Sequence, residues 1–252
     1  LIGGLHARGA EGDGTPVPRD GLMLPRVGTL GAAPAGSEVI VVQIEHDGSI
    51  HVDGNGPFGL QGLNEALRQA TADPKTRNQD GTSRRPLLIM ADGNVPWLIV
   101  QWVLMMAAHP VVAIPGIHFA AHPLQGSTVG AIGFPLPQDR AGAGGVEAPP
   151  RMGLTISTAH DLPASDLSTL FPEIAARTRP QGGAGSVHFE IRTPPPLGPR
   201  VPTHCVIQTL DVLARAGVRT VTLTGAAMPA GALQTPLEWI RREAAELRTG
   251  SG

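Results

Sequence analysis

The amino-acid sequence predicts an α/β protein (α+β, two layers) in which two tandem units each alternate strands with helices. Short runs rich in Val and Ile alternate with segments whose apolar residues recur every three or four positions, the period of an amphipathic helix. Two strand-like runs are joined by Asp47-Gly48, a strong short-range hairpin signal. The order of elements then returns at an offset of about 106 residues, which indicates a degenerate internal repeat.

The first unit is expected over residues 38–122, in the order β-β-α-β-α-β. Its strands and helices are expected over residues 39–45, 49–53, 59–72, 86–91, 97–108 and 111–121. Asp73-Pro74 ends the first helix, and Pro96 suits the first turn of the second. Pro115 assigns part of the last strand to an edge or a bulge.

The second unit is expected over residues 151–226, without a counterpart of the Asp-Gly hairpin. Its elements are expected over residues 152–158, 163–178, 186–192, 201–216 and 218–224. Aligning Val95-Pro96 with Val201-Pro202 brings the apolar positions of the two helices that follow into register. Residues 227–252 are expected to form a C-terminal amphipathic helix and tail.

Two segments rich in Gly and Pro have no periodicity. Residues 1–37 are interpreted as a linker or a loosely attached arm, and residues 123–150 as a connector. No Asp, Glu, Lys or Arg occurs between Gly93 and Gln138. The uncharged loop within this stretch is expected to pack on a domain face, the alternative being an exposed apolar patch for a partner.

The composition excludes several classes of function. The chain has 19 basic and 21 acidic residues, 3% aromatic residues and no Tyr, so nucleic acid is not an expected partner. Cys205 is the only cysteine, which excludes an internal disulfide and a thiolate metal cluster. The longest apolar run, residues 97–108, is shorter than the roughly 20 residues of a membrane span, so the segment is expected to be soluble.

One motif suggests an enzyme. Gly54-Asn-Gly-Pro-Phe-Gly59 fits G-x-G-x-x-G between a strand and a helix, with Asp73 near the expected distance, as in dinucleotide-binding folds. The strand before it is short and polar-alternating, however, whereas that motif follows a buried parallel strand. Pro57 also removes one backbone N–H. A hairpin-to-helix loop is the favoured interpretation, and a nucleotide-binding α/β enzyme remains the alternative.

The other candidates for chemistry are interpreted as structural. Cys205 and His204 are adjacent on a helix and point about 100° apart, and Cys205 takes the core position of Ile99. His118 and His122 are expected in a strand and the loop after it, without an acidic third ligand. The remaining histidines have no metal-binding spacing: His6, His46, His51, His109, His160 and His188.

Paired carboxylates are the last candidate. Asp47 and Asp92 occupy turn positions, where Asp bonds its own backbone. We therefore predict no catalytic, cofactor-binding or metal-binding residue, no cofactor and no enzymatic activity.

The sequence resembles the periplasmic domain of the ExbD/TolR family of biopolymer-transport proteins. The resemblance lies in the hairpin IEHDGSIHVDG, the helix LQGLNEALRQA, and the run PLLIMADGNVPWLIVQWVLMMAA. The second half repeats the end of this pattern as VPTHCVIQTLDVLARAGVRTVTLTG. The junction residues that carry the resemblance are candidates for partner binding or structure: Ala91, Asp92, Val95, Pro96, Val201 and Pro202.

The resemblance implies a non-enzymatic subunit of an inner-membrane motor driven by the proton motive force. Its partners would be an ExbB/TolQ-like channel subunit and either peptidoglycan or a TonB/Tol-like transducer, and its domains would self-associate. Its location would be the periplasmic side of the inner membrane. No counterpart of the family's membrane helix, with its proton-carrying aspartate, is present in these 252 residues, so membrane coupling is implied by the resemblance alone. With two copies in one chain, we expect the pair to form internally.

Overall fold

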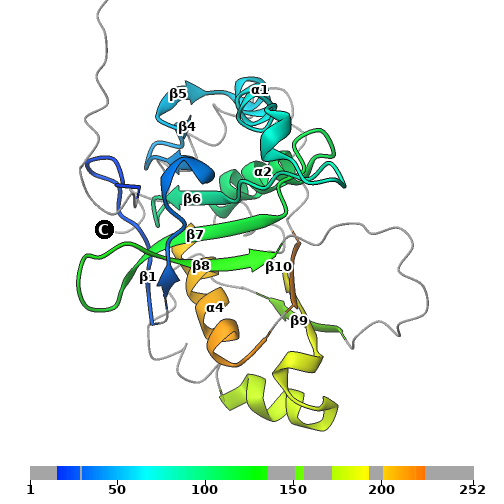
Figure 1. The fold of residues 1–252 in the computed structure, drawn as a ribbon. Coiled ribbons are helices and arrows are strands. Elements are labelled where there is room, and N and C mark those ends of the chain that lie inside the picture. The colour runs from blue at the N-terminus through cyan, green and yellow to red at the C-terminus, as the bar shows by residue number, and fades with distance from the viewer. Residues whose placement is uncertain are drawn as a thin grey trace, which may run out of the picture.

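The computed structural model describes residues 16–28, 30–135, 151–155, 172–192, 201–218 and 220–224. The expected C-terminal helix, His6, His160 and most of the first helix of the second unit lie outside these residues. Within them the fold is a mixed α+β fold with a mixed eight-stranded sheet and a parallel three-stranded sheet (Figure 1).

The elements follow the predicted order closely between residues 38 and 108. The first part of the chain contains β1 (Arg26–Val27), β2 (Gly31–Ala32), β3 (Ile40–Ile44), β4 (Ile50–Val52), β5 (Asn55–Phe58), α1 (Leu60–Ala70), β6 (Leu87–Ala91), α2 (Trp97–Ala108), β7 (Gly116–Pro123) and β8 (Gly130–Pro135). The second part contains β9 (Arg151–Thr155), the helical residues 172–178, β10 (His188–Arg192), α4 (Thr203–Arg215) and β11 (Thr220–Thr224). Short 3-10 turns cover residues 36–38, 74–76, 179–181 and 184–186.

The first sheet is built around three parallel strands that step in one direction. Its strand order is β2-β8-β7-β6-β3-β4-β5, and β3, β6 and β7 are parallel. Because parallel crossovers are right-handed, α1 and α2 both pack on the same face of this sheet. Their buried side chains share one core with Val42, Ile89 and Phe119.

Helix α2 is buried on nearly all sides, which explains why its sequence is apolar without a polar face. It contacts α1 and α4 and shares a core with the first sheet, and nine of its twelve residues are buried. An all-apolar helix of this length is therefore a central core element.

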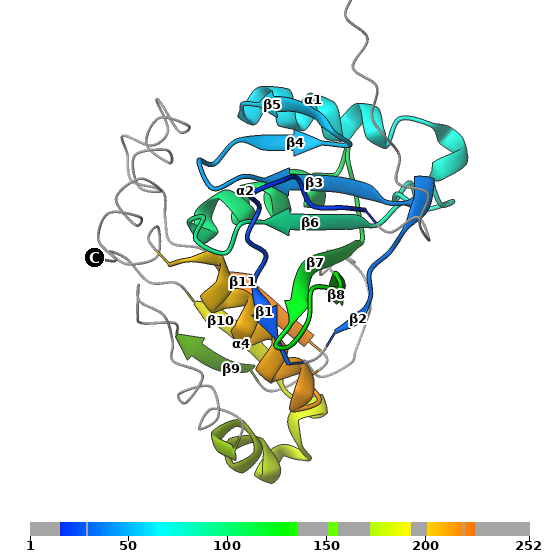
Figure 2. The same cartoon turned by 90° about the vertical axis from the view of Figure 1, so that its left-hand side faces the viewer.

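The opposite face of the first sheet is covered by residues 16–28 and 30–37, which we call the N-terminal arm. Leu22, Leu24 and Ala33 pack there in a second core with Leu88 and Met90. Figure 2 shows this arm in front of β3 and β6, with α2 behind them. The prediction of a loosely attached arm over residues 1–37 is therefore wrong for these residues. They cover the apolar face of the first sheet on which no helix packs.

The predicted connector over residues 123–150 is corrected for residues 123–135, and its remainder, residues 136–150, lies outside the described residues. Residues 130–135 form β8, which pairs antiparallel with β7, and β2 of the arm pairs with β8. A Cβ on Gly130 would lie 2.7 Å from the Leu30 Cβ, so this glycine permits a close strand contact rather than marking a loop. Ala131 and Ile132 are buried, so part of the uncharged segment packs on a domain face as expected, while Leu124 is 63% exposed.

Strand β7 starts later than predicted and is an inner strand. It begins at Gly116, after Pro115, and pairs with β6, β8 and β1. Residues 109–115 form the turn that follows α2. The prediction that Pro115 assigns this strand to an edge or a bulge is wrong, because the proline precedes the strand and takes no N–H from it.

The second sheet repeats the central part of the first. Val42, Ile89 and Phe119 are register partners across β3, β6 and β7, and Met152, Phe189 and Val221 are register partners across β9, β10 and β11. In both sheets the three strands are parallel and lie in chain order. The expected absence of a hairpin from the second unit concerns residues 156–171, which lie outside the described residues.

A packed arm predicts that a single apolar truncation within it destabilises the protein. Leu24 is 6% exposed, so Leu24→Ala should lower the free energy of unfolding by about 2 kcal/mol. Val17, on the same arm, is 67% exposed, and Val17→Ala should change it by less than about 0.5 kcal/mol. Guanidinium unfolding of both variants measures the difference; equal effects of the two substitutions would contradict the packing of the arm.

Candidate functional site

The two units meet at the residues that the sequence analysis aligned. The Trp97 N–H donates to the Val201 carbonyl (2.8 Å), and the Thr203 N–H donates to the Val95 carbonyl (2.8 Å). Pro96 and Pro202 lie opposite each other between these bonds. We call residues 93–97 and 201–204 the junction. Its two hydrogen bonds join equivalent positions of the two units reciprocally, as in a two-fold arrangement.

The prolines fit this geometry for a simple reason. In an antiparallel pair, residues at a non-hydrogen-bonded position need no N–H, and that is where Pro96 and Pro202 lie. The bridge stays short because each segment turns into a helix at the next residue, α2 at Trp97 and α4 at Thr203. The junction is therefore a short, self-limiting contact between the two units.

Further contacts from α4 strengthen the junction. The Thr203 hydroxyl donates to the Val95 carbonyl (2.7 Å), and the His204 N–H donates to the Gly93 carbonyl (2.9 Å). His204 Nδ1 lies 2.8 Å from the same Gly93 oxygen, so this nitrogen carries the proton and donates. The His204 ring is thus held against the backbone of the first unit, and Cys205 beside it is fully buried in the core, as predicted.

Asp92 is a structural residue immediately before the junction. Its side chain is fully buried; Oδ1 accepts from the Asn94 N–H (2.9 Å), and Oδ2 accepts from the Met23 N–H (3.1 Å). The Gly93 N–H donates in return to the Met23 carbonyl (2.8 Å). The predicted Asp turn is confirmed, and the arm is its second partner.

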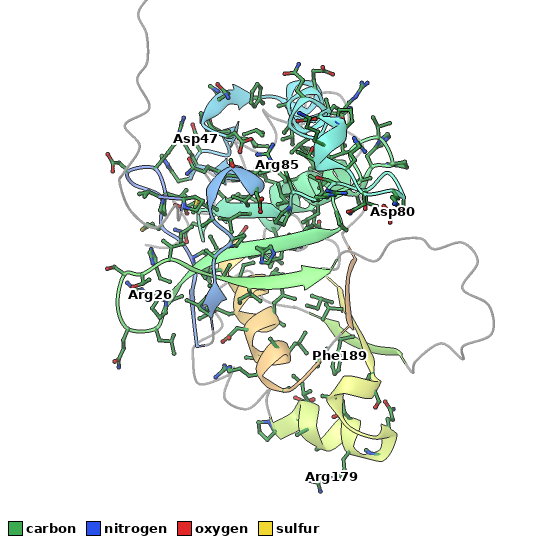
Figure 3. The ribbon with its side chains drawn as sticks, in the orientation of Figure 1. Arg26, Asp47, Asp80, Arg85, Arg179 and Phe189 are labelled. Atoms are coloured by element: carbon green, nitrogen blue, oxygen red, sulfur yellow. The ribbon has the colours of Figure 1, made fainter. Side chains whose placement is uncertain are left out.

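The arm also contacts the second unit directly. The Gly28 N–H donates to Asp211 Oδ2 (2.9 Å) on α4, and Arg215 Nη2 lies 3.2 Å from the same oxygen. Arg26, labelled in Figure 3, reaches back to the carbonyls of the β7–β8 loop. The arm therefore holds the first sheet, the junction and α4 together.

The glycine-rich segment Gly54–Gly59 has a different role from a phosphate loop. Residues 55–58 form β5, an antiparallel outer strand paired with β4, so the expectation of an irregular loop is wrong for them. Asp53 and Gly54 make the tight turn with positive φ. A Cβ on Gly56 would lie 2.8 Å from the Ile50 carbonyl, so backbone already fills that side. These contacts leave the dinucleotide interpretation without geometric support.

The carboxyl end of β6, the middle one of the three parallel strands, is covered by other parts of the chain. Nucleotide folds place their ligands at a topological switch point, where successive strands are laid down in opposite directions. Strands β3, β6 and β7 follow one another across the sheet in chain order, so the order does not reverse among them. In addition, Met23 and His204 contact the backbone that follows β6. The described strands thus present no crevice of that kind.

The other candidate residues remain apart. Asp47 accepts from the Ser49 N–H (2.8 Å) and closes the hairpin turn, as predicted. His118 and His122 both lie in β7, which corrects the loop position expected for His122. Burial lowers the pKa of His118. Within the described residues, no group of three or more His, Cys, Asp or Glu is placed to hold a metal ion.

In comparisons with known proteins, no family model, curated protein or solved structure matches the chain. Among the described helices, none has both the length and the apolar character needed to cross a bilayer.

Sequence reasoning missed two groups of residues. The junction partners Thr203 and Met23 act through contacts between segments far apart in the chain. A cluster of Arg19, Glu45 and His51, described below, joins the arm to the β3–β4 hairpin. Neither group has a local sequence pattern that could have revealed it.

Replacing one carboxylate oxygen of Asp92 by an amide nitrogen should lower the free energy of unfolding. In Asp92→Asn, the side-chain amide either faces the Met23 N–H or leaves a buried donor unpaired, so we expect a loss of about 1–3 kcal/mol in the free energy of unfolding. Asp73→Asn is the matched control, because Asp73 is an exposed cap whose Oδ1 accepts from the Lys75 N–H and Asn caps equally well. Thermal and chemical unfolding compare the two; equal stability would contradict the structural role of Asp92.

The absence of geometric support for a nucleotide site is testable by ligand stabilisation. A ligand present at about 100 times its Kd stabilises a protein by about 2.7 kcal/mol. We expect no shift of the melting temperature with NAD or ATP at millimolar concentration. A reproducible shift that Gly54→Ala abolishes would restore the nucleotide-binding alternative.

Proposed function

We propose that this chain is the periplasmic portion of an ExbD/TolR-like subunit, a non-enzymatic module that binds the cell wall or a transducer and transmits force. The order hairpin, helix, strand, helix, strand over β3 to β7 is the order that the sequence resemblance implies. The partners of the whole protein would include an ExbB/TolQ-like channel subunit at the inner membrane.

The reciprocal bonding of the junction is the observation on which the proposal depends most. Equivalent residues, Val95 with Thr203 and Val201 with Trp97, bond each other across the two units. This favours an internal pair of duplicated domains, in place of the pairing of separate chains that the resemblance implies. A force applied to one unit would then pass to the other through a contact within the same chain.

The second sheet supplies the better edge for a binding partner. Its outer strand β11, Thr220–Thr224, has no charge and no proline, and among the described residues it pairs with β10 alone. In the first sheet, the corresponding strand β7 has β8 and β1 beside it. Natural edge strands usually carry a charge, a proline or a bulge that prevents pairing, so β11 is suited to receive an extended peptide by strand addition.

The outer strand of the first sheet is the poorer candidate. In β5, Pro57 lacks an N–H, and three of the four residues of this strand are exposed. A partner strand would lose a hydrogen bond at this position. We therefore place peptide binding on the second unit and assign the hairpin of the first unit a structural role.

Two binding assays test the function. Purified peptidoglycan should retain the protein in a sedimentation assay, or an extended transducer peptide should bind in a calorimetric titration. For a peptide that adds to β11, N-methylation of alternate residues should weaken binding by about tenfold or more, because each backbone bond contributes about 1 kcal/mol. A peptide of the same composition in scrambled order is the control.

Binding to neither probe would contradict the proposal and favour a purely architectural protein. Peptide binding that tolerates N-methylation would instead contradict strand addition while leaving the force-transmitting role supported.

A further inference from the structure

The arm is fastened at its beginning by a charged cluster over the β3–β4 hairpin. Arg19 Nη1 donates to Glu45 Oε1 (2.9 Å) and lies 3.0 Å from His51 Nε2. Arg19 Nη2 donates to the Gly54 carbonyl (3.1 Å). His51 is 5% exposed, and its Nε2 lies 3.2 Å from Glu45 Oε1. We call Arg19, Glu45 and His51 the clasp.

The clasp, as it stands, requires a neutral His51. An arginine donates and never accepts, so the short Arg19–His51 contact uses the lone pair of Nε2. The imidazole proton therefore resides on Nδ1, which is buried and has no hydrogen-bond partner among the described residues. Adding a second proton at Nε2 would place two N–H donors and two positive charges face to face.

We propose that the arm is a pH-sensitive strap, in which protonation of His51 transfers Glu45 from Arg19 to the imidazolium and releases the arm from the first sheet. The proton comes from solvent and is held at Nε2. Glu45 Oε1 is within reach of that nitrogen, so the protonated ring exchanges one partner for another. Arg19 then loses an acceptor and faces a cation.

The surrounding charges agree with this direction. Burial and the positive charge of Arg19 lower the pKa of His51, and Glu45 and Asp47 oppose that shift. Asp53, the next acidic residue along this chain segment, is engaged by Arg85 and by the Val41 N–H. Because the docked arm favours the neutral ring, acid favours the undocked arm. Docking is complete above the ordinary histidine pKa of about 6.5 and weakens as the pH falls below it.

Release would reach beyond the clasp. Past Arg19 the arm binds the buried carboxylate of Asp92 through the Met23 N–H and covers Leu88 and Met90. Undocking would therefore uncover the apolar face of the first sheet and take the Met23 N–H donor away from the Asp92 carboxylate, next to the junction. The strap thus links the protonation of one residue to the contact between the two units, independently of what the second unit binds.

Hydrogen–deuterium exchange of the full chain tests the strap. The Leu22 N–H donates to the Arg19 carbonyl, and the Met23 N–H donates to Asp92 Oδ2. After correction for intrinsic exchange, both amides should be protected at about pH 7.5 and lose protection at about pH 5. Each pKa unit by which docking lowers the pKa of His51 corresponds to about a tenfold loss of amide protection at low pH. His51→Gln should abolish the pH dependence. His46→Gln, at an exposed histidine in the adjacent turn, should retain it.

A second measurement covers the case in which His51→Gln does not fold. In an NMR titration, the His51 pKa of the native chain should lie below that of Arg19→Met, a variant that keeps the length of the side chain and removes the charge. The proposal is overturned by pH-independent protection of the arm, by pH dependence that survives in His51→Gln, or by an identical His51 pKa with and without Arg19.

Discussion

The structure depends on a constraint set by the order of its strands. Because β3, β6 and β7 are laid down in one direction, both crossover helices lie on one face of the first sheet. The opposite face and the backbone after β6 must then be covered by other parts of the chain. The arm covers the face, and the second unit, held by the bonds between Val95, Trp97, Val201 and Thr203, covers the end of the strand.

This constraint gives the junction its chemical character. Buried backbone groups need partners, and the junction supplies them reciprocally from two equivalent segments. Asp92 completes the set by accepting from both its own turn and the arm. A carboxylate committed to two backbone donors is a structural element rather than an acid or a base. The region that the sequence resemblance singles out is therefore where the parts of the chain are joined.

The sequence predicted what is local and missed what is long-range. The helices at 60–70 and 97–108 and the hairpin at Asp47-Gly48 are specified by periodicity and turn chemistry. Strands β1, β2 and β8 are short or glycine-rich and exist through pairing with distant segments, which no local window contains. Gly130 illustrates the difficulty: it resembles a loop residue in the sequence, yet it is needed where Leu30 approaches β8. The clasp was missed for the same reason, since Arg19 and His51 meet only in the folded chain.

The central claim is that two units of one chain pair through their Val-Pro segments. Amide exchange of Trp97 and Thr203, followed by NMR over a range of protein concentrations, tests it most directly. These two N–H groups bond the opposite unit, so the account predicts that both are protected to a similar extent at every concentration, including those at which the chain is monomeric. Protection that appears only as chains associate, or in one of the two amides alone, would contradict it.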